Sequence, residues 1–330
     1  MLKRRSAEYM VKALALCMLA GAGGTACAQT GTEYPAKSIH IVVVYGAGGG
    51  LDVVTRVVAD PLTRSLGRQV VVENKPGAGG NIGTEYVARA APDGYTLMVT
   101  TNSHEINSFI YKNPGYDPRK DFTPVIQLTG APSVIITHPR TGFPSLKDLV
   151  NAARAEPGKI TFGSAGNGSP THIAMEMFKS VAKIDLVHVP YKTAAQANGD
   201  VVAGQNQLAM AALPGVMSQI QGGALRALAM TTEKRWEGLP DVPTIAESGY
   251  PGFSHVTWIG VFVPAATPPA IAGKLNREIA AILQDKPIRE RLMGLGAEPV
   301  GRSMADFGAM LKADYEIMGK LIPKLGVKID

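Results

Sequence analysis

The chain has 330 residues, a formal net charge of +6 and two cysteines, and its length favours two domains. So mild a positive charge, with no run of basic residues, argues against a nucleic-acid-binding protein. Both cysteines, Cys17 and Cys27, lie among the first 28 residues. The rest of the chain therefore has no disulfide and must depend on a large apolar core.

The first 28 residues have the pattern of a secretory signal peptide. A basic start precedes an apolar run over 13–22, which is too short to cross a membrane. We expect export to the periplasm as a soluble protein with cleavage after Ala28, by either the Sec or the twin-arginine route. Cys27 lacks the upstream leucine of a lipoprotein signal. Loss of this segment, with its four Lys/Arg and one Glu, would lower the net charge from +6 to +3.

Short β-branched, apolar runs alternate with helical segments along the remaining chain. We expect strands over 39–44, 70–74, 95–101, 122–128, 133–138, 159–164, 186–191, 207–211, 225–232 and 258–264. We expect helices over 52–66, 82–91, 146–155, 171–181, 194–203, 269–284, 287–294 and 303–320. This alternation predicts an α/β protein with parallel sheets covered on both faces. Such sheets bind ligands at the carboxyl ends of their strands.

Two glycine-rich loops each join a predicted strand to a predicted helix. The first lies in VVVYGAGGGLDVVTR (43–57), and the second in FGSAGNGSPTH (162–172). Both would point backbone N–H groups and the positive end of a helix dipole at a ligand, which makes an anion site without arginine. Glycine permits a close approach and a positive φ. Ser164, Ser169 and Thr171 would add hydroxyl donors.

Each of these features also has a structural explanation. Glycine-rich turns often serve tight strand–helix packing alone, although two such loops in one chain favour a ligand site. Asp52 suits an N-cap of its own helix better than a ligand contact. His172 lies in the first turn of a helix, where it could either bond to a loop carbonyl or contact the ligand.

Motifs for nucleotide, catalytic and metal sites are absent from the sequence. The first loop departs from G-x-G-x-x-G at Leu51, and neither G-x-x-x-x-G-K-[ST] nor G-x-S-x-G occurs. The glycines of 76–83 have no matching acidic residue. The six histidines are scattered, with no H-x-x-x-H pair. We therefore expect no cofactor and no metal.

Ten segments, in this order and spacing, carry a resemblance that covers nearly all of the chain after residue 28. They are YPAKSIHIVV (34–43), GAGGGLD (46–52), VVVENKPGAGGNIG (70–83), ARAAPDGYTL (88–97), YDPRKDFTPV (116–125), PGKITFGSAGNGSPTHIAMEMFK (157–179), VHVPYK (187–192), GALRALAMTTEKR (223–235), LPDVPTIAESGYPGF (239–253) and GAEPVG (296–301). They resemble the tripartite tricarboxylate transporter substrate-binding proteins, also called the Bug or TctC family.

The resemblance implies the fold of a type II periplasmic binding protein, in which two α/β lobes close on a ligand. Residues 29–125 and 228–330 would form lobe 1, and 126–227 lobe 2. Crossing strands near 122–128 and 225–232 would act as the hinge.

The resemblance also implies a carboxylate held by backbone amides of both loops. Carried onto this chain, the first loop comprises Tyr45, Gly46, Ala47, Gly48, Gly49 and Gly50. The second comprises Ser164, Ala165, Gly166, Gly168, Ser169, Thr171 and His172. The remaining walls would come from Thr101, Asn102, Tyr191 and Lys192.

The sequence departs from the family pattern around this site. Val44-Tyr45 replace the usual Pro-Phe, Ala47 replaces a proline and Leu51 a threonine. Gln207 stands at a usually acidic place, and Ala211 and Ala212 stand where polar groups are usual. We therefore expect a less polar far wall and a carboxylate whose remainder is partly apolar, such as an aromatic or nicotinate-like ring.

The resulting hypothesis is a monomeric periplasmic binding protein without catalytic activity. It would capture a small carboxylate and deliver it to the membrane subunits of a tripartite transporter. The sequence does not separate this role from that of a sensor whose closed form is read by a membrane receptor. An exported hydrolase or lyase that uses His172 or Lys192 is the third alternative.

Overall fold

The computed structural model describes residues 34–140 and 143–329. The predicted signal peptide, its cleavage point and both cysteines lie outside the described residues. The chain from Lys37 onwards forms one compact unit, which is described below. Among the described residues, no helix is long and apolar enough to cross a membrane.

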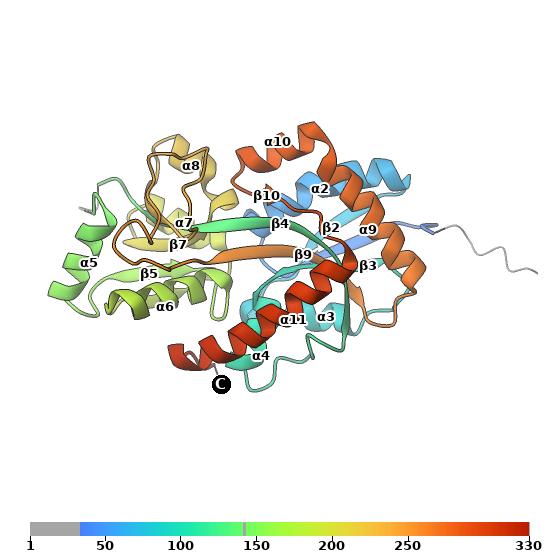
Figure 1. Ribbon diagram of the computed structural model, residues 1–330, viewed down its shortest axis with the longest axis horizontal. Coiled ribbons are helices and arrows are strands. Elements are labelled where there is room, and N and C mark those ends of the chain that lie inside the picture. Colours follow the sequence, from blue (N-terminus) through green and yellow to red (C-terminus); the bar gives the residue numbers. More distant parts are fainter. Residues whose placement is uncertain (1–33, 141–142, 330) are drawn as a thin grey trace, which may run out of the picture. The chain divides into compact units, whose positions relative to one another are not determined.

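The first sheet combines strands from both ends of the chain (Figure 1). Three parallel strands lie in the order β2 (Val70–Asn74), β1 (Ile39–Val43) and β3 (Thr96–Thr101). The strand β9 (Val256–Pro264) runs antiparallel to β3 and also pairs with the first part of the long strand β4 (Phe122–Thr137). The short β10 (Glu298–Pro299) pairs with β4 as well.

The long strand β4 continues into a second sheet. Its residues 133–137 pair antiparallel with β7 (Leu208–Ala212), and β8 (Arg226–Met230) pairs with the same end of β4. Beyond β7 lie β5 (Thr161–Ser164) and β6 (Val187–Pro190), both parallel to it. We call the first sheet and its helices the first lobe, and the end of β4 with β5 to β8 and their helices the second lobe.

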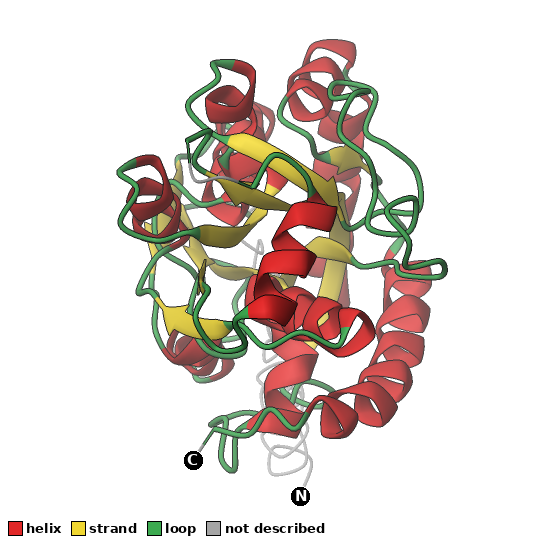
Figure 2. Cartoon of the chain, turned by 90° about the vertical axis from the view of Figure 1, so that its left-hand side faces the viewer, coloured by secondary structure: helices red, strands yellow, loops and turns green. Residues whose placement is uncertain are grey.

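Helices cover the sheets of both lobes (Figure 2). The first lobe has α2 (Gly50–Leu66), α3 (Asn81–Ala88), α4 (Ser103–Ile110), α9 (Pro269–Gln284), α10 (Lys286–Gly294), α11 (Met304–Leu321) and the 3₁₀ turns η1 (Ala78–Gly80) and η3 (Ile322–Leu325). The second lobe has α5 (Leu146–Ala155), α6 (Pro170–Ala182), α7 (Ala194–Val202), α8 (Met217–Gln221) and η2 (Leu213–Gly215). Polar N-caps begin α5, α6, α7 and α11, where a Ser or Thr hydroxyl accepts a backbone N–H three residues on.

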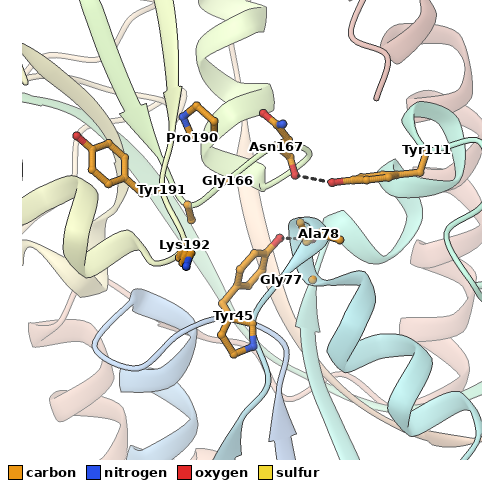
Figure 3. Close-up of a pocket in the computed structure, with 13 residues that line it drawn as sticks. Tyr45, Gly77, Ala78, Tyr111, Gly166, Asn167, Pro190, Tyr191 and Lys192 are labelled. Carbon is orange, nitrogen blue, oxygen red and sulfur yellow. Dashed lines mark hydrogen bonds between the residues drawn. The ribbon is translucent and has the colours of Figure 1, made fainter. Parts of the chain in front are cut away.

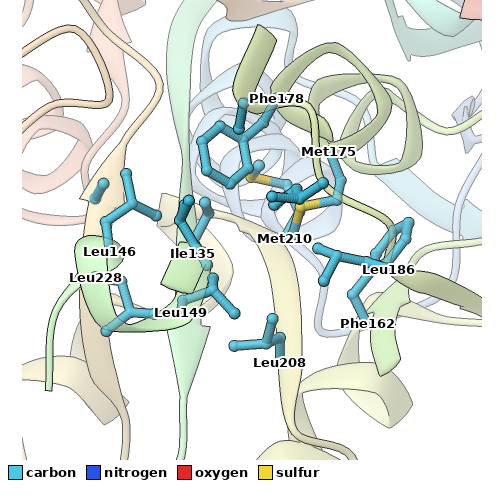
Figure 4. Packing of buried hydrophobic residues seen from close by; sticks show 14 of the residues in the cluster. Ile135, Leu146, Leu149, Phe162, Met175, Phe178, Leu186, Leu208, Met210 and Leu228 are labelled. Atoms are coloured by element: carbon cyan, nitrogen blue, oxygen red, sulfur yellow. The ribbon is translucent and has the colours of Figure 1, made fainter. Parts of the chain in front are cut away.

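The sheet of the second lobe has an apolar core on each face. Figure 4 shows the core that contains Ile135, Phe162, Phe178 and Leu208. Val134 and Ile136, which flank Ile135 on β4, belong to the core on the opposite face, because successive side chains of a strand point to opposite faces. The core of Figure 4 also contains four later residues: Leu228, Ala229, Ile245 and Phe253. We propose on this basis that the second lobe extends beyond residue 227, to the start of β9.

Most predicted strands and helices are confirmed, but three expectations were wrong and one helix beside the site was missed. The strands expected at 122–128 and 133–138 are the single strand β4. The return crossing expected near 225–232 is not there, because β8 pairs with 134–137 of β4, within the second sheet, and the second long strand beside β4 is β9. The sheets are mixed, because β4 and β9 pair antiparallel to their neighbours. The helix α4, which follows β3 directly, was not expected.

Candidate functional site

Two cavities adjoin the first glycine loop, and Tyr45 and Ala165 line both of them. The inner chamber has a volume of about 50 Å³, and the outer pocket, drawn in Figure 3, about 400 Å³. Open hollows of similar size occur elsewhere, such as one of about 540 Å³ beside Tyr86, so volume does not identify the site. These two cavities differ from the others because residues of both predicted loops line them.

The predicted site residues fall into three groups. Seven line the inner chamber: Tyr45, Gly46, Gly49, Gly50, Thr101, Ala165 and Thr171. Five line the outer pocket: Tyr45 and Ala165, which also line the inner chamber, with Gly166, Tyr191 and Lys192. The others line neither cavity: Ala47, Gly48, Asn102, Ser164, Gly168, Ser169 and His172.

The first loop offers free backbone donors. Within residues 34–140 and 143–329, the N–H groups of Gly46, Ala47 and Gly49 donate no hydrogen bond. The Gly48 N–H is different, because it donates to Asp52 Oδ2 over 2.9 Å. Gly48 has φ +77°, in the left-handed region that favours glycine. Three amides of this loop therefore remain available to an anion.

Asp52 holds this loop in shape, and its predicted role as N-cap was wrong. The N-cap position of α2 is Gly49, which makes no side-chain cap. Asp52 Oδ1 accepts from Arg56 Nε (3.0 Å) and from Asn74 Nδ2 (3.0 Å), while the same Asn74 amide donates to the Tyr45 carbonyl. Burial alone would raise the pKa of Asp52, but the bonds from Arg56, Gly48 and Asn74 lower it below its ordinary value.

Replacing this carboxylate should both destabilise the protein and loosen the loop. Asp52→Ala removes the charged acceptor of the Gly48 N–H, the Asn74 amide and Arg56, so we expect a loss of about 1.5–3 kcal/mol in the free energy of unfolding. Chemical denaturation measures this loss. Asp60→Ala, an exposed acid on the same helix, should change stability by less than about 0.5 kcal/mol. Equal effects of the two variants would contradict the role of Asp52.

The second loop satisfies most of its own donors, which corrects the expectation of free amides there. Ala165 N donates to Thr171 Oγ1, Gly166 N to Ser164 Oγ and His172 N to the N-cap hydroxyl of Ser169. The three hydroxyl groups therefore stabilise the loop itself. Of its residues, only the N–H groups of Asn167 and Thr171 donate no hydrogen bond within the part of the chain that the structure describes.

His172 belongs to the support of this loop. Its Nδ1 accepts the Gly168 N–H (3.2 Å), so the partner is a loop amide and not the carbonyl that the sequence suggested. Its ring stacks on His188 with centroids 4.0 Å apart, and His188 Nε2 lies 2.6 Å from Ser164 Oγ. Burial, with a smaller effect of Lys179, lowers the pKa of His172 to about 4. The neutral ring can therefore accept this bond at neutral pH.

The two lobes touch beside the inner chamber. A Cβ on Gly46 would overlap the side chain of Thr193, the N-cap of α7, and a Cβ on Gly50 would lie 3.0 Å from Ala212 Cβ. Tyr111 Oη also donates to the Asn167 carbonyl over 3.2 Å (Figure 3). The first two amides of α7 have no acceptor within their helix, and its N-terminal residue Ala194 lines the chamber. The glycine run thus permits contact between lobes as well as access to its amides.

The sequence reading missed the wall formed by 76–80. Pro76, Gly77, Ala78, Gly79 and Gly80 line the outer pocket, together with Tyr111, Asn167 and Pro190. Ala78 has φ +46°, an uncommon conformation for a residue with a side chain. The closely spaced glycines of this segment were the available signal.

The far wall of the inner chamber is apolar. Ala212 lines it, with Ala131 from β4 and Ile259 from β9. Ala211 instead packs into a core of the second lobe. Gln207 is a structural residue, because its Oε1 accepts the Thr161 N–H over 2.8 Å. Among the described residues there is no group of three His, Cys, Asp or Glu that could hold a metal ion.

Comparison with known proteins gives a consistent result. A family model described as "Tripartite tricarboxylate transporter family receptor" matches residues 54–327. Protein BugT of Bordetella pertussis is 37% identical over 279 residues, which cover 84% of this chain and 86% of BugT.

Solved structures resemble the chain over most of its length. The periplasmic binding protein BugD is 36% identical, with a TM-score of 0.85, and the match covers 89% of this chain and 99% of BugD. Rpa4515 of R. palustris, solved with adipate, is 34% identical with a TM-score of 0.87, over 90% and 99% of the two chains. MatC of Rhodopseudomonas palustris, with bound malate, is 28% identical with a TM-score of 0.83, over 88% and 100%.

Proposed function

The chain belongs to the tripartite tricarboxylate transporter receptor family, and from this premise we propose that it captures a small carboxylate between its lobes for delivery to a tripartite membrane transporter. The resemblance carried by the sequence motifs is confirmed, and so is the two-lobed α/β fold of a type II periplasmic binding protein. Relatives solved with adipate and with malate support a carboxylate as the ligand.

The free amides of the first loop carry this proposal. The N–H groups of Gly46 and Gly49, which line the inner chamber, would bind the carboxylate, assisted by the N-terminus of α7 across the chamber. Backbone amides and a helix dipole stabilise an anion without a buried cation. The inner chamber has room for the carboxylate head of a ligand but not for a whole dicarboxylate.

The rest of the ligand would extend into the outer pocket. Lys192 is exposed there and forms no ion pair within the described residues, so a second anionic group is compatible with this end. The apolar wall around Ala212 favours a hydrocarbon portion between the two ends. Ligand that contacts both lobes binds the closed arrangement more tightly and therefore shifts the population towards it.

The remaining assignments follow from the family and from the site. Members of the family are periplasmic binding proteins, and we propose that this chain is exported with cleavage after Ala28 and acts as a monomer without catalytic activity. A sensor role would use the same closed form. A hydrolase or lyase that uses His172 has less support, because this ring is buried, bonded to Gly168 and outside both cavities.

A thermal-shift panel on ligand-free protein tests the function. The protein is unfolded and refolded to remove carried ligand, then mixed with adipate, malate, tricarboxylates, acidic amino acids and aromatic carboxylates. A ligand at 100 times its Kd should add about 2.7 kcal/mol, which raises Tm by roughly 5–10 °C. No shift with any carboxylate would count against the proposal, and turnover of any of them would favour the enzyme alternative.

A further inference from the structure

The inner chamber contains one hydroxyl whose hydrogen bonds are unmet. Four polar side chains line it: Tyr45, Thr101, Thr171 and Thr257. Tyr45 donates to the Gly79 carbonyl, Thr101 pairs with Ser103, and Thr171 accepts from Ala165. Thr257 Oγ1 is buried and has no partner within the described residues. A buried hydroxyl without a partner is costly, so this position calls for an explanation.

Thr257 forms part of the chamber floor, on the strand β9 that lies beside β4. It stands opposite Ala131 in the antiparallel register, and Ala131 and Ile259 line the same chamber. The next residue, Trp258, points to the other face, where its Nε1 donates to Asp314. The alternation of β9 therefore sends Thr257 to the ligand side. This side chain is 5% exposed, so solvent does not satisfy its hydroxyl.

We propose that Thr257 is a ligand-binding residue whose hydroxyl donates a hydrogen bond to the carboxylate head in the inner chamber. This inference rests on the proposed function and adds a side-chain donor to a site otherwise made of backbone amides. The carboxylate would then meet the amides of the first loop on one side and the floor hydroxyl on another. The ligand class that follows bears an ionised oxygen acid at its inserted end, and an alkyl group there would leave Thr257 unpaired.

The test compares Thr257→Val with Thr257→Ser and with a matched control. Valine keeps the shape of threonine but removes the hydroxyl, so the Kd for adipate or malate should rise about tenfold or more. Serine keeps the donor and should keep most of the affinity. The control is Thr100→Val, because Thr100 Oγ1 is also buried without a partner but lies on the other face of β3 and lines neither cavity.

Isothermal titration with adipate and malate measures Kd, and Tm of the unliganded proteins measures stability. Both valine variants should be at least as stable as the wild type, and only Thr257→Val should lose affinity. Equal affinity of Thr257→Val and wild type would overturn the contact and leave the proposed function standing. No binding of either acid by the wild type would overturn the contact and count against the proposed function too.

Discussion

A single methyl group at position 79 should hold the lobes apart and weaken carboxylate binding by more than tenfold. A Cβ on Gly79 would overlap the Asn167 carbonyl of the second lobe. Gly79 cannot move away easily, because its own carbonyl accepts from Tyr45 Oη (2.9 Å) and from Asn107 Nδ2 (3.0 Å). Gly79→Ala therefore opposes closure, and affinity falls by the fraction of closed protein that is lost.

Gly67→Ala separates this effect from backbone strain. Gly67 has φ +62° and Gly79 φ +63°, and nothing lies within 4 Å of a Cβ on Gly67. Both alanines should lower stability by about 1 kcal/mol, the usual penalty of a side chain in the left-handed region. Only Gly79→Ala should raise Kd in titration with adipate or malate and enlarge the radius of gyration of the ligand-mixed protein. Equal Kd values for the two variants would show that closure does not depend on this contact.

The strands and most helices could be predicted because local composition decides them. The run IHIVV of β1 and the capped segment SLKDLVNAARA of α5 have few alternatives. The helix α4 was missed because SHEINSFI places polar residues at buried positions such as His104, Glu105 and Asn107. His104, for example, is buried by tertiary packing against Tyr116, Phe122 and Phe262, which no local pattern reports.

The two glycine loops could be located from sequence, but the state of their amides could not. The patterns GAGGG and GSAGNGS look equivalent, yet only the first keeps several donors free. The difference depends on Ser164, Thr171 and His172, whose side chains turn back onto their own loop. Thr257 gave no local signal either, because its position on the chamber floor follows from the pairing of β9 with β4, whose partner residues lie far apart in the chain.

Stability should be greatest near pH 6.5 and fall on both sides of it. Burial lowers the pKa values of His104, His172 and His255 to about 4 each. These rings stay neutral in the folded protein while their unfolded counterparts gain protons below about pH 6.5. Unfolding then takes up protons, so stability is lost as the pH falls from about 6.5 towards 4. His188, which is half-buried, acts in the same direction.

Glu105 contributes to the pH dependence of stability with the opposite sign. Burial, and then the charge of Asp314, raise the pKa of Glu105 to about 10. The folded protein keeps this proton while the unfolded chain loses it above about pH 4.5, so the stability contribution of the neutral carboxyl is lost as the pH rises towards 10. Between pH 4.5 and 6.5 the three buried histidines outweigh one glutamate, so stability should rise with pH by about 2.7 kcal/mol per unit, before the further contribution of the half-buried His188. Above pH 6.5 Glu105 alone should lower it by about 1.4 kcal/mol per unit.

Two variants show which residue causes each slope of stability against pH, when urea unfolding is measured from pH 4.5 to 9. Glu105→Gln keeps the size of the side chain and should abolish the decline above pH 6.5. His104→Phe keeps an aromatic ring among Tyr116, Phe122 and Phe262 and should reduce the slope on the acid side by about one proton, or 1.4 kcal/mol per unit. A wild-type profile that is flat from pH 5 to 8 would mean that these four groups are not held in their neutral forms by burial. Because His172 supports the second loop through Gly168, the acid limb should also be the range in which ligand affinity first declines.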